Sequence, residues 1–353
     1  MAVWFFTPPG ARVFEFEEHE LKAIWYESHG DARDVLRVGE RPVPEPAAGE
    51  LRVRVAWSGV NRSDVKRRAR PNAQDADSPW FIPHMDGSGV VEKVGPDVDP
   101  KRVGERVWLH RSALRRQWGT AAEFTVVPQH QAVALPQQVS LQAGATLGVP
   151  LLTAHRALLG LGPVEGRTVL VHGGGGSVGF YAIQLARWAG ARRVLATAGN
   201  EHTIAEALRA GADAVVDYRS EDLAEKVLEL TDSEGVDHII DVDFGANLPH
   251  TVRMLRLHGS IATFASLGNP TPQLPFYEIM PLNWRILFVA LYGMPLDVQL
   301  QANEDVTRWL SSGQVQWPQM HEYAMEDAPA AHEHVESGRT GRALVRVSAD
   351  LGV

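Results

Sequence analysis

Hydrophobic and polar positions along the 353-residue chain follow two patterns, which meet near residue 150. From Leu21 to about Val133, short apolar runs are separated by Gly and Pro, and the run at 51–57 alternates apolar with polar residues. A period of two is typical of a strand with one buried face, and frequent turn residues favour antiparallel pairing. This part is predicted to be a barrel-like, mostly antiparallel unit with further strands at 21–26, 89–95, 106–109 and 122–127.

From about Leu151, short apolar runs alternate with amphipathic segments. Strands are predicted at 168–172, 193–198, 214–217, 238–242 and 260–265, and helices at 178–189, 201–209, 221–230 and 248–257. This order predicts a parallel sheet covered on both faces and joined by right-handed crossovers, which is the doubly wound Rossmann architecture. After about Tyr292 the rhythm is lost, and the run at 341–347 predicts a strand that returns to the first unit.

Residues 1–20 are expected to be an extension ahead of the folded part. The segment carries no Lys or Arg before Arg12, Pro8 and Pro9 interrupt its apolar stretch, and acidic residues follow it. A secretory signal would show a basic start and a longer apolar core.

Composition narrows the classes of function. Lys and Arg number 34 against 43 Asp and Glu, which gives a net charge of −9 without a basic block, so nucleic acid is not expected as a partner. The chain has no cysteine, which excludes disulfides, thiolate zinc sites and iron–sulfur clusters. No apolar run reaches the roughly 18 residues of a membrane span. We expect a cytoplasmic protein without a membrane partner.

The motif VHGGGGSVG at 171–179 lies between a predicted strand and a predicted helix. Gly173, Gly176 and Gly179 have the spacing of a dinucleotide-binding turn, which needs a tight bend, close backbone approach to the pyrophosphate and close contact between helix and strand. The helix then directs its first N–H groups at the phosphates. We expect the motif, including Gly174, Gly175, Ser177 and Val178, to bind a dinucleotide.

The end of the second Rossmann strand favours NADP(H) over NAD(H). An NAD site usually places Asp or Glu there for the ribose 2′-hydroxyl, whereas this chain has Thr197, Ala198 and Gly199. Tyr218 and Arg219, after the third strand, would supply a donor and a positive charge to a 2′-phosphate. The alternative is that these two residues only cap a strand end.

The order of these parts resembles the medium-chain dehydrogenase/reductase superfamily, and within it the zinc-independent quinone oxidoreductase group. The resemblance covers about residues 21–347 and is carried by the motifs SGVNRSDVK (58–66), IPHMDGSGVVEKVG (82–95), VGERV (103–107), GTAAEF (119–124), LTAHRAL (152–158), the glycine motif and ESGRTGR (336–342). It implies a GroES-like catalytic domain at 21–150 and 293–353, and a Rossmann cofactor domain at 151–292.

Zinc-dependent members of the superfamily hold the metal with Cys, His and Cys. At the matching positions this chain has Asn61, Met85 and about Val149, none of which is a good zinc ligand. His84 and Asp86 flank Met85, but they are expected to point to opposite sides. His332 and His334 are expected on a solvated helix, where they would not share a face. We therefore expect no metal.

By the same resemblance, Asn61 contacts the nicotinamide, Ser63 stands at the position of the proton-relay hydroxyl, and Lys66 stands at that of the relay His. These three are the predicted catalytic residues, although Asn61 alternatively stabilises a turn and Lys66 alternatively belongs to a solvated basic face. Asp64 is expected to hold the loop through backbone N–H groups. Arg342 and Arg339 are expected at the cofactor phosphates. The remaining expected cofactor residues are Thr153, Phe264 and Ser266, and Trp80 and Phe276 are candidates for the substrate pocket.

The function expected is NADPH-dependent hydride transfer to a quinone or an α,β-unsaturated carbonyl without a metal, because such an electrophile needs only a few hydrogen-bond donors. Two alternatives are an alcohol dehydrogenase with an altered metal site and a non-catalytic NADPH-binding protein. The partner expected is a small molecule, and the apolar run at 286–292 is predicted to be an edge strand that pairs across a homodimer.

Overall fold

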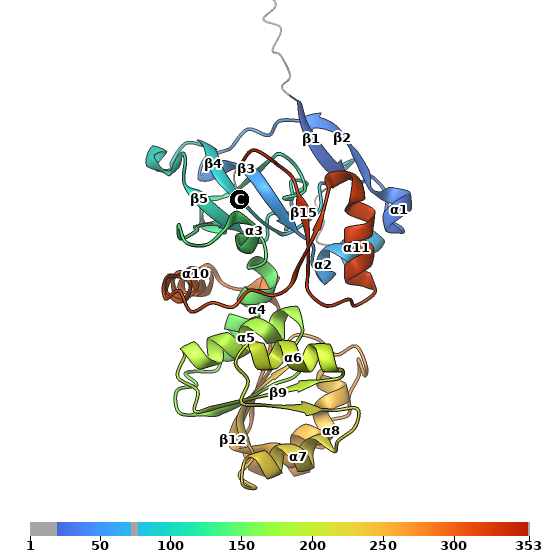
Figure 1. Cartoon of the computed structure of the whole chain (residues 1–353), viewed down its shortest axis with the longest axis vertical. Helices are drawn as coiled ribbons and strands as arrows, with labels where there is room; N and C mark the ends of the chain where they lie inside the picture. The colour runs from blue at the N-terminus through green and yellow to red at the C-terminus, as the bar shows by residue number, and fades with distance from the viewer. Residues whose placement is uncertain (1–19, 72–76, 352–353) are drawn as a thin grey trace, which may run out of the picture.

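The computed structural model describes residues 20–71 and 77–351. Figure 1 shows two units, of which one is built from the first and the last segments of the chain and the other from the middle. The last strand lies among the early strands of the first unit, as the sequence predicts. The predicted class, a mostly β unit joined to a parallel-sheet α/β unit, is confirmed.

The first unit is a curved, mostly antiparallel sheet. Its strand order is β14-β15-β3-β4-β5-β7, with β6 paired to β3, and a β1-β2 hairpin lies beside it. Leu51 and Val53 of β3 pack inside with Val107 and Leu109 of β5, as the alternating pattern requires. The strands are β1 (Glu20–Trp25), β2 (Arg37–Pro42), β3 (Glu50–Gly59), β4 (Asp86–Val94), β5 (Arg106–Leu109), β6 (Phe124–Pro128), β7 (Ala132–Ala134), β14 (Met320–Tyr323) and β15 (Arg342–Arg346). The helices are α1 (Ala32–Val35), α2 (Arg62–Ala69), α3 (Leu141–Gly144) and α11 (Ala328–Glu336), with short 3₁₀ turns η1 (Pro100–Arg102), η2 (Gln129–Gln131) and η5 (Met325–Asp327).

The second unit is a parallel sheet in the order β10-β9-β8-β11-β12-β13. Both faces are buried, because Val169 and Val171 of β8 pack on one side while Leu170 packs on the other. The strands are β8 (Thr168–Val171), β9 (Arg193–Ala198), β10 (Ala214–Asp217), β11 (Val236–Asp241), β12 (Leu255–Thr263) and β13 (Arg285–Phe288). The helices are α5 (Ser177–Trp188), α6 (Glu201–Arg209), α7 (Leu223–Leu230), α8 (Phe244–Met254) and α9 (Phe276–Ile279), with turns η3 (Met280–Leu282) and η4 (Leu291–Gly293).

Two helices join the units, and the rhythm of the sequence did not predict either. They are α4 (Gly148–Leu159) and α10 (Leu296–Ser311), which lie between the two sheets in Figure 1. One apolar cluster runs from Trp57 and Trp108 of the first unit through α4 to Val169 of the second. The expected boundary between residues 150 and 151 therefore lies inside a helix, and the proposed division into domains stays a prediction.

Helix α8 ends three residues before its predicted end. Leu255 is buried and pairs with Val236 at the start of β12, so residues 255–257 belong to the strand. Their apolar character fits either element, and the demand for a neighbour to β11 decides between them.

The expectation of a solvated helix at His332 and His334 is wrong. Both side chains are buried on α11, which packs against β15 and α1. His332 approaches His84, and His334 accepts or donates a hydrogen bond at the Tyr323 hydroxyl, 3.0 Å away. In the residues described, no helix has the length and apolar character needed to cross a membrane.

Candidate functional site

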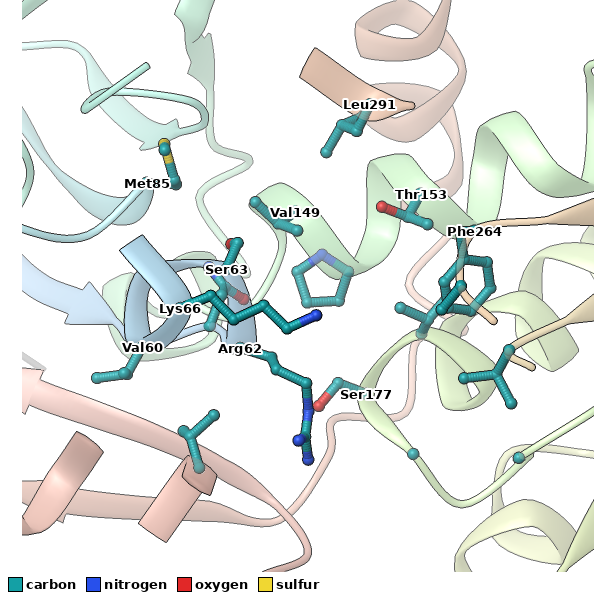
Figure 2. Close-up of a pocket in the computed structure, with 18 of the residues that line it drawn as sticks. Val60, Arg62, Ser63, Lys66, Met85, Val149, Thr153, Ser177, Phe264 and Leu291 are labelled. Carbon is teal, nitrogen blue, oxygen red and sulfur yellow. The ribbon is translucent and has the colours of Figure 1, made fainter. Parts of the chain in front are cut away.

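A cavity of about 1160 Å³ opens between the two units. Its walls come from the start of α2, the start of α4, the glycine turn before α5, and the segments before β15 and after β12. Figure 2 shows residues from these separate elements facing one space. Predicted site residues on its wall are Asn61, Ser63, Lys66, Thr153, Gly173, Gly175, Gly176, Ser177, Val178, Phe264, Arg339 and Arg342.

The glycine turn connects the buried strand β8 to α5 through backbone positions where side chains do not fit. Gly173 has a φ of +68°, a left-handed conformation that L side chains rarely adopt. A Cβ at Gly179 would lie 2.2 Å from the Gly173 carbonyl oxygen, so glycine allows helix and turn to touch. A Cβ at Gly176 would meet only that oxygen, at 3.2 Å, and would otherwise face the cavity. The unpaired N–H groups at the start of α5 thus border an open space of the kind that receives a phosphate.

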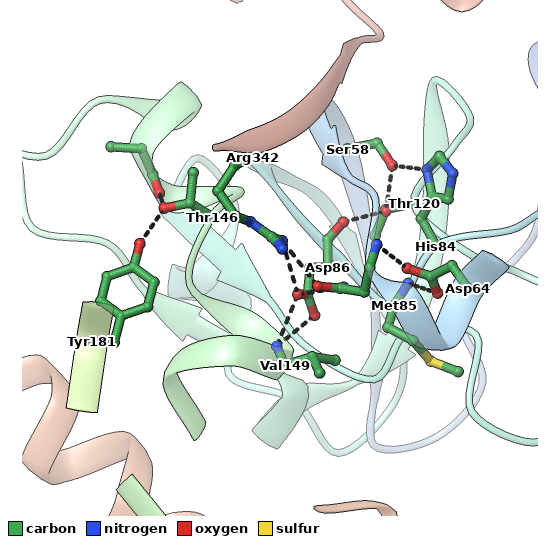
Figure 3. A network of polar contacts seen from close by, with 12 residues as sticks. Ser58, Asp64, His84, Met85, Asp86, Thr120, Thr146, Val149, Tyr181 and Arg342 are labelled. Carbon is green, nitrogen blue, oxygen red and sulfur yellow. Dashed lines mark hydrogen bonds and ion pairs between the residues drawn. The ribbon is translucent and has the colours of Figure 1, made fainter. Parts of the chain in front are cut away.

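Asp86 organises the wall opposite the glycine turn. Its buried carboxylate accepts hydrogen bonds from the Val149 backbone N–H at 2.9 and 2.8 Å and from Asn61 Nδ2 at 2.7 Å. The Arg342 guanidinium lies 3.8 Å away and donates to Asn61 Oδ1 at 2.9 Å (Figure 3). Burial raises the pKa of Asp86 to about 6, against the opposing charge of Arg342. A Cβ at Gly148 would lie 1.9 Å from the carboxylate, so the close approach of α4 depends on this glycine.

Asp64 fixes the loop that carries Asn61, as the sequence predicts. Its carboxylate accepts from the backbone N–H of Asn61 at 2.8 Å, which closes the first turn of α2, and from the N–H of Met85 at 3.1 Å. Burial and the nearby Asp86 raise the pKa of Asp64 to about 7. The Asn61 and Met85 backbones are thereby held side by side at the cavity wall.

The first turns of α2 project polar side chains into the cavity. Figure 2 shows Arg62 and Lys66 extending from α2 towards Ser177 at the start of α5. Ser63 Oγ and the Tyr292 hydroxyl also line the cavity; they lie close enough to interact with each other, and neither has another hydrogen-bond partner among the described residues. Burial raises the pKa of Tyr292 well above its ordinary value, so the phenol keeps its proton. Two hydroxyl donors and two cations therefore border the space.

The three residues at the zinc-ligand positions do meet. Asn61, Met85 and Val149 all line the cavity, but the Asn61 amide is engaged by Asp86 and Arg342, and the other two carry a thioether and an alkyl group. In the described ranges, no group of three His, Asp or Glu side chains could hold a metal ion. This donor set does not fit zinc.

His84 and Asp86 turn to different partners, as predicted. His84 Nδ1 lies 2.7 Å from Ser58 Oγ, and its Nε2 lies 2.9 Å from Nε2 of His332. Ser58 continues through Thr120, whose hydroxyl donates to the Asp86 carbonyl at 2.5 Å. Ser58, His84 and Thr120, which Figure 3 shows in this chain of hydrogen bonds, are not among the residues that line the cavity.

Several expected residues lie off the cavity wall. Thr197 is turned inward, with Oγ1 3.2 Å from both the Gly173 N–H nitrogen and His172 Nδ1. Gly199 packs against the Tyr218 ring, which is half exposed, and Ser266 accepts the Gly245 N–H at 2.9 Å. Also absent from the cavity lining are Gly174, Ala198 and Arg219.

The two aromatic candidates for a substrate pocket are not part of this cavity. Trp80 packs edge-on against Trp118 at 5.1 Å, with Arg41 over its ring, on the first unit. Phe276 is exposed on the short helix α9 beside Tyr277. The apolar positions on the wall are instead Met85, Leu114 and Leu291, among others.

Several polar residues of the site were not predicted as such from the sequence, and Arg62, Asp243 and Tyr292 are examples. Arg62 follows Asn61 directly in the same motif, so its position was available as a signal. Asp243, just after β11, lines the cavity, and its Oδ1 is buried without a partner in the described residues, while Oδ2 accepts the Gly268 N–H at 2.8 Å. Tyr292, the last residue of the run predicted as an edge strand, also lines the cavity, and the strand pattern did not mark its hydroxyl as part of the site.

Comparisons with known proteins agree with this arrangement. Residues 47–137 match the family described as "Alcohol dehydrogenase GroES-like domain", and residues 177–309 match "Zinc-binding dehydrogenase". The quinone oxidoreductase of Sus scrofa is 30% identical over 318 residues, which cover 86% of this chain and 91% of that protein. The 2-methylene-furan-3-one reductase of Solanum lycopersicum is 34% identical over 227 residues, 61% of this chain and 58% of that protein.

A solved structure extends the likeness over almost the whole chain. A mycobacterial protein in complex with NADPH has a TM-score of 0.78 at 27% identity, covering 92% of this chain and 99% of that one. The similarity to these relatives thus covers most of the sequence, including the segments that form the two sheets, the glycine turn and the cavity wall. The chain belongs to the medium-chain dehydrogenase/reductase superfamily, within its quinone oxidoreductase group.

Proposed function

We propose that this protein is an NADPH-dependent oxidoreductase that transfers hydride to a quinone or to an α,β-unsaturated carbonyl compound. One observation carries the proposal: the glycine turn and the Asn61–Asp86–Arg342 network face each other across one cavity. The activities named for the pig and tomato relatives supply the two substrate classes, and the mycobacterial structure supplies the cofactor.

The chain's own residues fit the cofactor. The start of α5 and the side chains of Arg62, Arg339 and Arg342 offer N–H groups and positive charge for the pyrophosphate. In this proposal the unpartnered carboxylate oxygen of Asp243, on the cavity wall, would accept a hydrogen bond from a ribose hydroxyl. When bound, NADPH supplies the hydride and both electrons of the reduction.

The preference for NADPH over NADH rests on the surface beyond the cavity. The end of β9 carries no carboxylate to repel a 2′-phosphate, and Tyr218 stands against Gly199 at this edge with Arg219 next to it in the chain. Thr197 contributes only indirectly in this proposal, because its hydroxyl faces the turn. Ala198 and Gly199 would then present backbone to the adenosine.

Substrate activation is assigned to hydrogen-bond donors. As hydride reaches the electrophile, negative charge builds on its conjugated oxygen, and the Ser63 and Tyr292 hydroxyls are the donors on the wall, while Lys66 extends towards the glycine turn and the cofactor. Asn61 is a positioning residue in this scheme, because both ends of its amide are bound to Asp86 and Arg342. Thr153 and Phe264 complete the wall on the side of the second unit.

We also propose that turnover needs no metal, since Asn61, Met85 and Val149 provide no zinc-binding set. The catalytic domain would comprise residues 21–150 and 293–353, and the cofactor domain residues 151–292. The edge strand β13 would pair with its copy in a homodimer.

A turnover assay with a chelator-treated protein tests the proposal. NADPH oxidation is followed with a panel of quinones and enones, and NADPH and NADH are titrated separately. We expect turnover of at least one class, and NADPH binding at least about tenfold tighter than NADH, worth roughly 1.4 kcal/mol. Arg219→Ala should reduce that preference, whereas Lys226→Ala, an exposed cation on α7, should leave it unchanged. Tight NADPH binding without any turnover would refute the reductase, and equal affinities would refute the cofactor assignment.

A further inference from the structure

The cavity is strongly cationic although the chain as a whole is acidic. The net charge of the protein is −9, yet seven of the described lining residues are Lys or Arg and only Asp243 is acidic. A cleft lined by one sign of charge concentrates ligands of the other sign. The positive charge on the wall therefore favours anionic ligands in this cavity.

Two of these seven cationic side chains already bind other groups of the protein. Arg342 is bound to Asp86 and Asn61. Arg67 is buried and donates to the backbone carbonyls of Ala113 and Arg116. The other five have no ion pair with an acidic residue of the described chain; they are Arg62, Lys66, Arg70, Arg115 and Arg339.

Three of the five belong to the cofactor half of the cavity. Arg62 and Lys66 extend towards Ser177 at the glycine turn (Figure 2). Arg339 follows Gly338 in the chain. A Cβ built on Gly338 would lie 3.8 Å from a guanidinium nitrogen of Arg62. The pyrophosphate of the proposed cofactor accounts for these charges.

Arg70 and Arg115 remain, and both lie next to residues that link the end of α2 to the loop at 111–116 rather than to the glycine turn. Arg70 is the residue that follows α2, three positions after Arg67, and Arg115 lies in the chain between Ala113 and Arg116, whose carbonyls accept from Arg67. The same loop is attached to the zinc-ligand position, because the Ser112 N–H donates to the Met85 carbonyl at 3.0 Å. Both free cations thus border the region where the substrate, rather than the cofactor phosphates, is expected.

We propose that Arg70 and Arg115 form a subsite for an anionic group of the substrate. The electrophile reduced by this enzyme would then be an enone or a quinone that carries a carboxylate, sulfonate or phosphate, and guanidinium groups would bind that anion. This inference rests on the proposed function and specifies its substrate class.

Paired substrates test the subsite. The probes are 4-oxopent-2-enoate and its uncharged methyl ester, compared at saturating NADPH in the wild type, Arg70→Glu and Arg115→Glu. Each charge reversal should lower kcat/KM for the carboxylate by about tenfold or more and change it for the ester by less than about twofold. Lys101→Glu, an exposed cation on η1, is the matched control and should change neither. Arg115→Lys should retain part of the preference.

Salt and direct binding complete the test. Added salt should lower kcat/KM for the carboxylate in the wild type and have little effect in the Arg70→Glu, Arg115→Glu double variant. Calorimetric titration of both probes into NADP⁺-saturated protein should show tighter binding of the carboxylate, lost in the double variant. Equal binding of the two probes, or equal losses for both in the variants, would overturn the subsite. Absence of turnover in the wild type would refute the proposed function instead, and the titration would still decide the subsite.

Discussion

At the scale of single residues, the carboxylate of Asp86 joins three segments that are distant in the sequence. It holds the Asn61 side chain, the Val149 N–H and the Arg342 guanidinium in a site closed to solvent. Because each of these residues also lines the cavity, Asp86 connects the shape of the site to the stability of the fold.

Asp86→Ala should therefore destabilise the protein strongly. Removing one partner of a buried ion pair leaves an uncompensated charge and costs about 3–5 kcal/mol. Denaturant unfolding, compared with Glu40→Ala at an exposed position of β2, measures the loss. A change within about 0.5 kcal/mol of that control would show that the network contributes little.

The motifs predicted the residues of this network singly but not their contacts. Asn61 and Arg342 were expected at the cofactor, and Asp64 as a loop support, because each belongs to a recognisable motif. The bond from Val149 to Asp86 spans 63 residues, and no local pattern encodes it. For Thr197, the sequence predicted the position at the end of β9 but not the direction of the side chain, because that direction depends on the neighbouring glycine turn.

At the scale of elements, two glycines of the glycine turn have different roles, although nothing in the sequence distinguishes them. Gly179 lets α5 touch the turn, whereas Gly176 borders the open cavity. The four adjacent glycines give no sign of this difference, because it depends on where the helix axis passes.

Gly176→Val and Gly179→Val should consequently fail in different ways. Gly176→Val should keep its thermal midpoint within a few degrees and lose NADPH binding, because the side chain fills the space of the pyrophosphate. Gly179→Val should lower the midpoint as well, since helix and turn must separate. Thermal unfolding beside NADPH titration distinguishes them; unchanged binding in Gly176→Val would mean that the cofactor is misplaced.

Helix α11 is attached to the segment before β4 through two buried imidazoles, those of His332 and His84. His84 and His332 are neutral, because burial lowers the pKa of His84 to about 3 and that of His332 well below its ordinary value, with Arg68 also disfavouring a positive charge. The unfolded chain takes up protons on both below about pH 6.5, which the folded chain does not. Their contribution to stability is thus present above that pH and is lost as the pH falls.

His332→Gln should weaken the acid sensitivity while preserving a donor to His84. Between pH 7 and 5, the unfolding free energy should fall less steeply than in the wild type, by at most about 1.4 kcal/mol per pH unit for one proton. Asp64 and Asp86, whose raised pKa values act in the opposite direction, are present in both proteins. His202→Gln, at an exposed position, should follow the wild type; identical slopes in all three proteins would contradict this view of the pair.

At the scale of the whole molecule, the alternation of patterns predicted both sheets and the return of the last strand, because buried strands and covering helices impose their periods on the sequence. The predicted edge strand at 286–292 is confirmed over residues 286–288, where β13 ends the parallel sheet, whereas Leu291 and Tyr292 belong to the 3₁₀ turn η4. The connecting helices α4 and α10 were not predicted. The segment of α4 was used only as a family motif, at 152–158, and α10 follows the point where the pattern of alternating strands and helices ends. The homodimer stays a prediction.

Exposed aromatic residues on β13 and on the preceding helix α9 suggest which surface the predicted homodimer would bury. Phe288, Phe276 and Tyr277 are 69%, 59% and 84% exposed, which is unusual for large apolar side chains unless a partner covers them. Phe288→Glu should shift the protein from dimer to monomer in sedimentation analysis, whereas Leu208→Glu on α6 should not. A wild-type protein that is monomeric at all concentrations would rule out the dimer.

We propose above that this chain passes a hydride directly from NADPH to a conjugated electrophile without a metal. The most direct measurement uses NADPH deuterated at the nicotinamide C4 on the transferred face, chelator-treated protein and an enone that is turned over, with mass spectrometry of the product. We expect one deuterium on the former β-carbon of the enone and an unchanged rate after chelation. An unlabelled product, or activity that returns only when zinc is added, would contradict it.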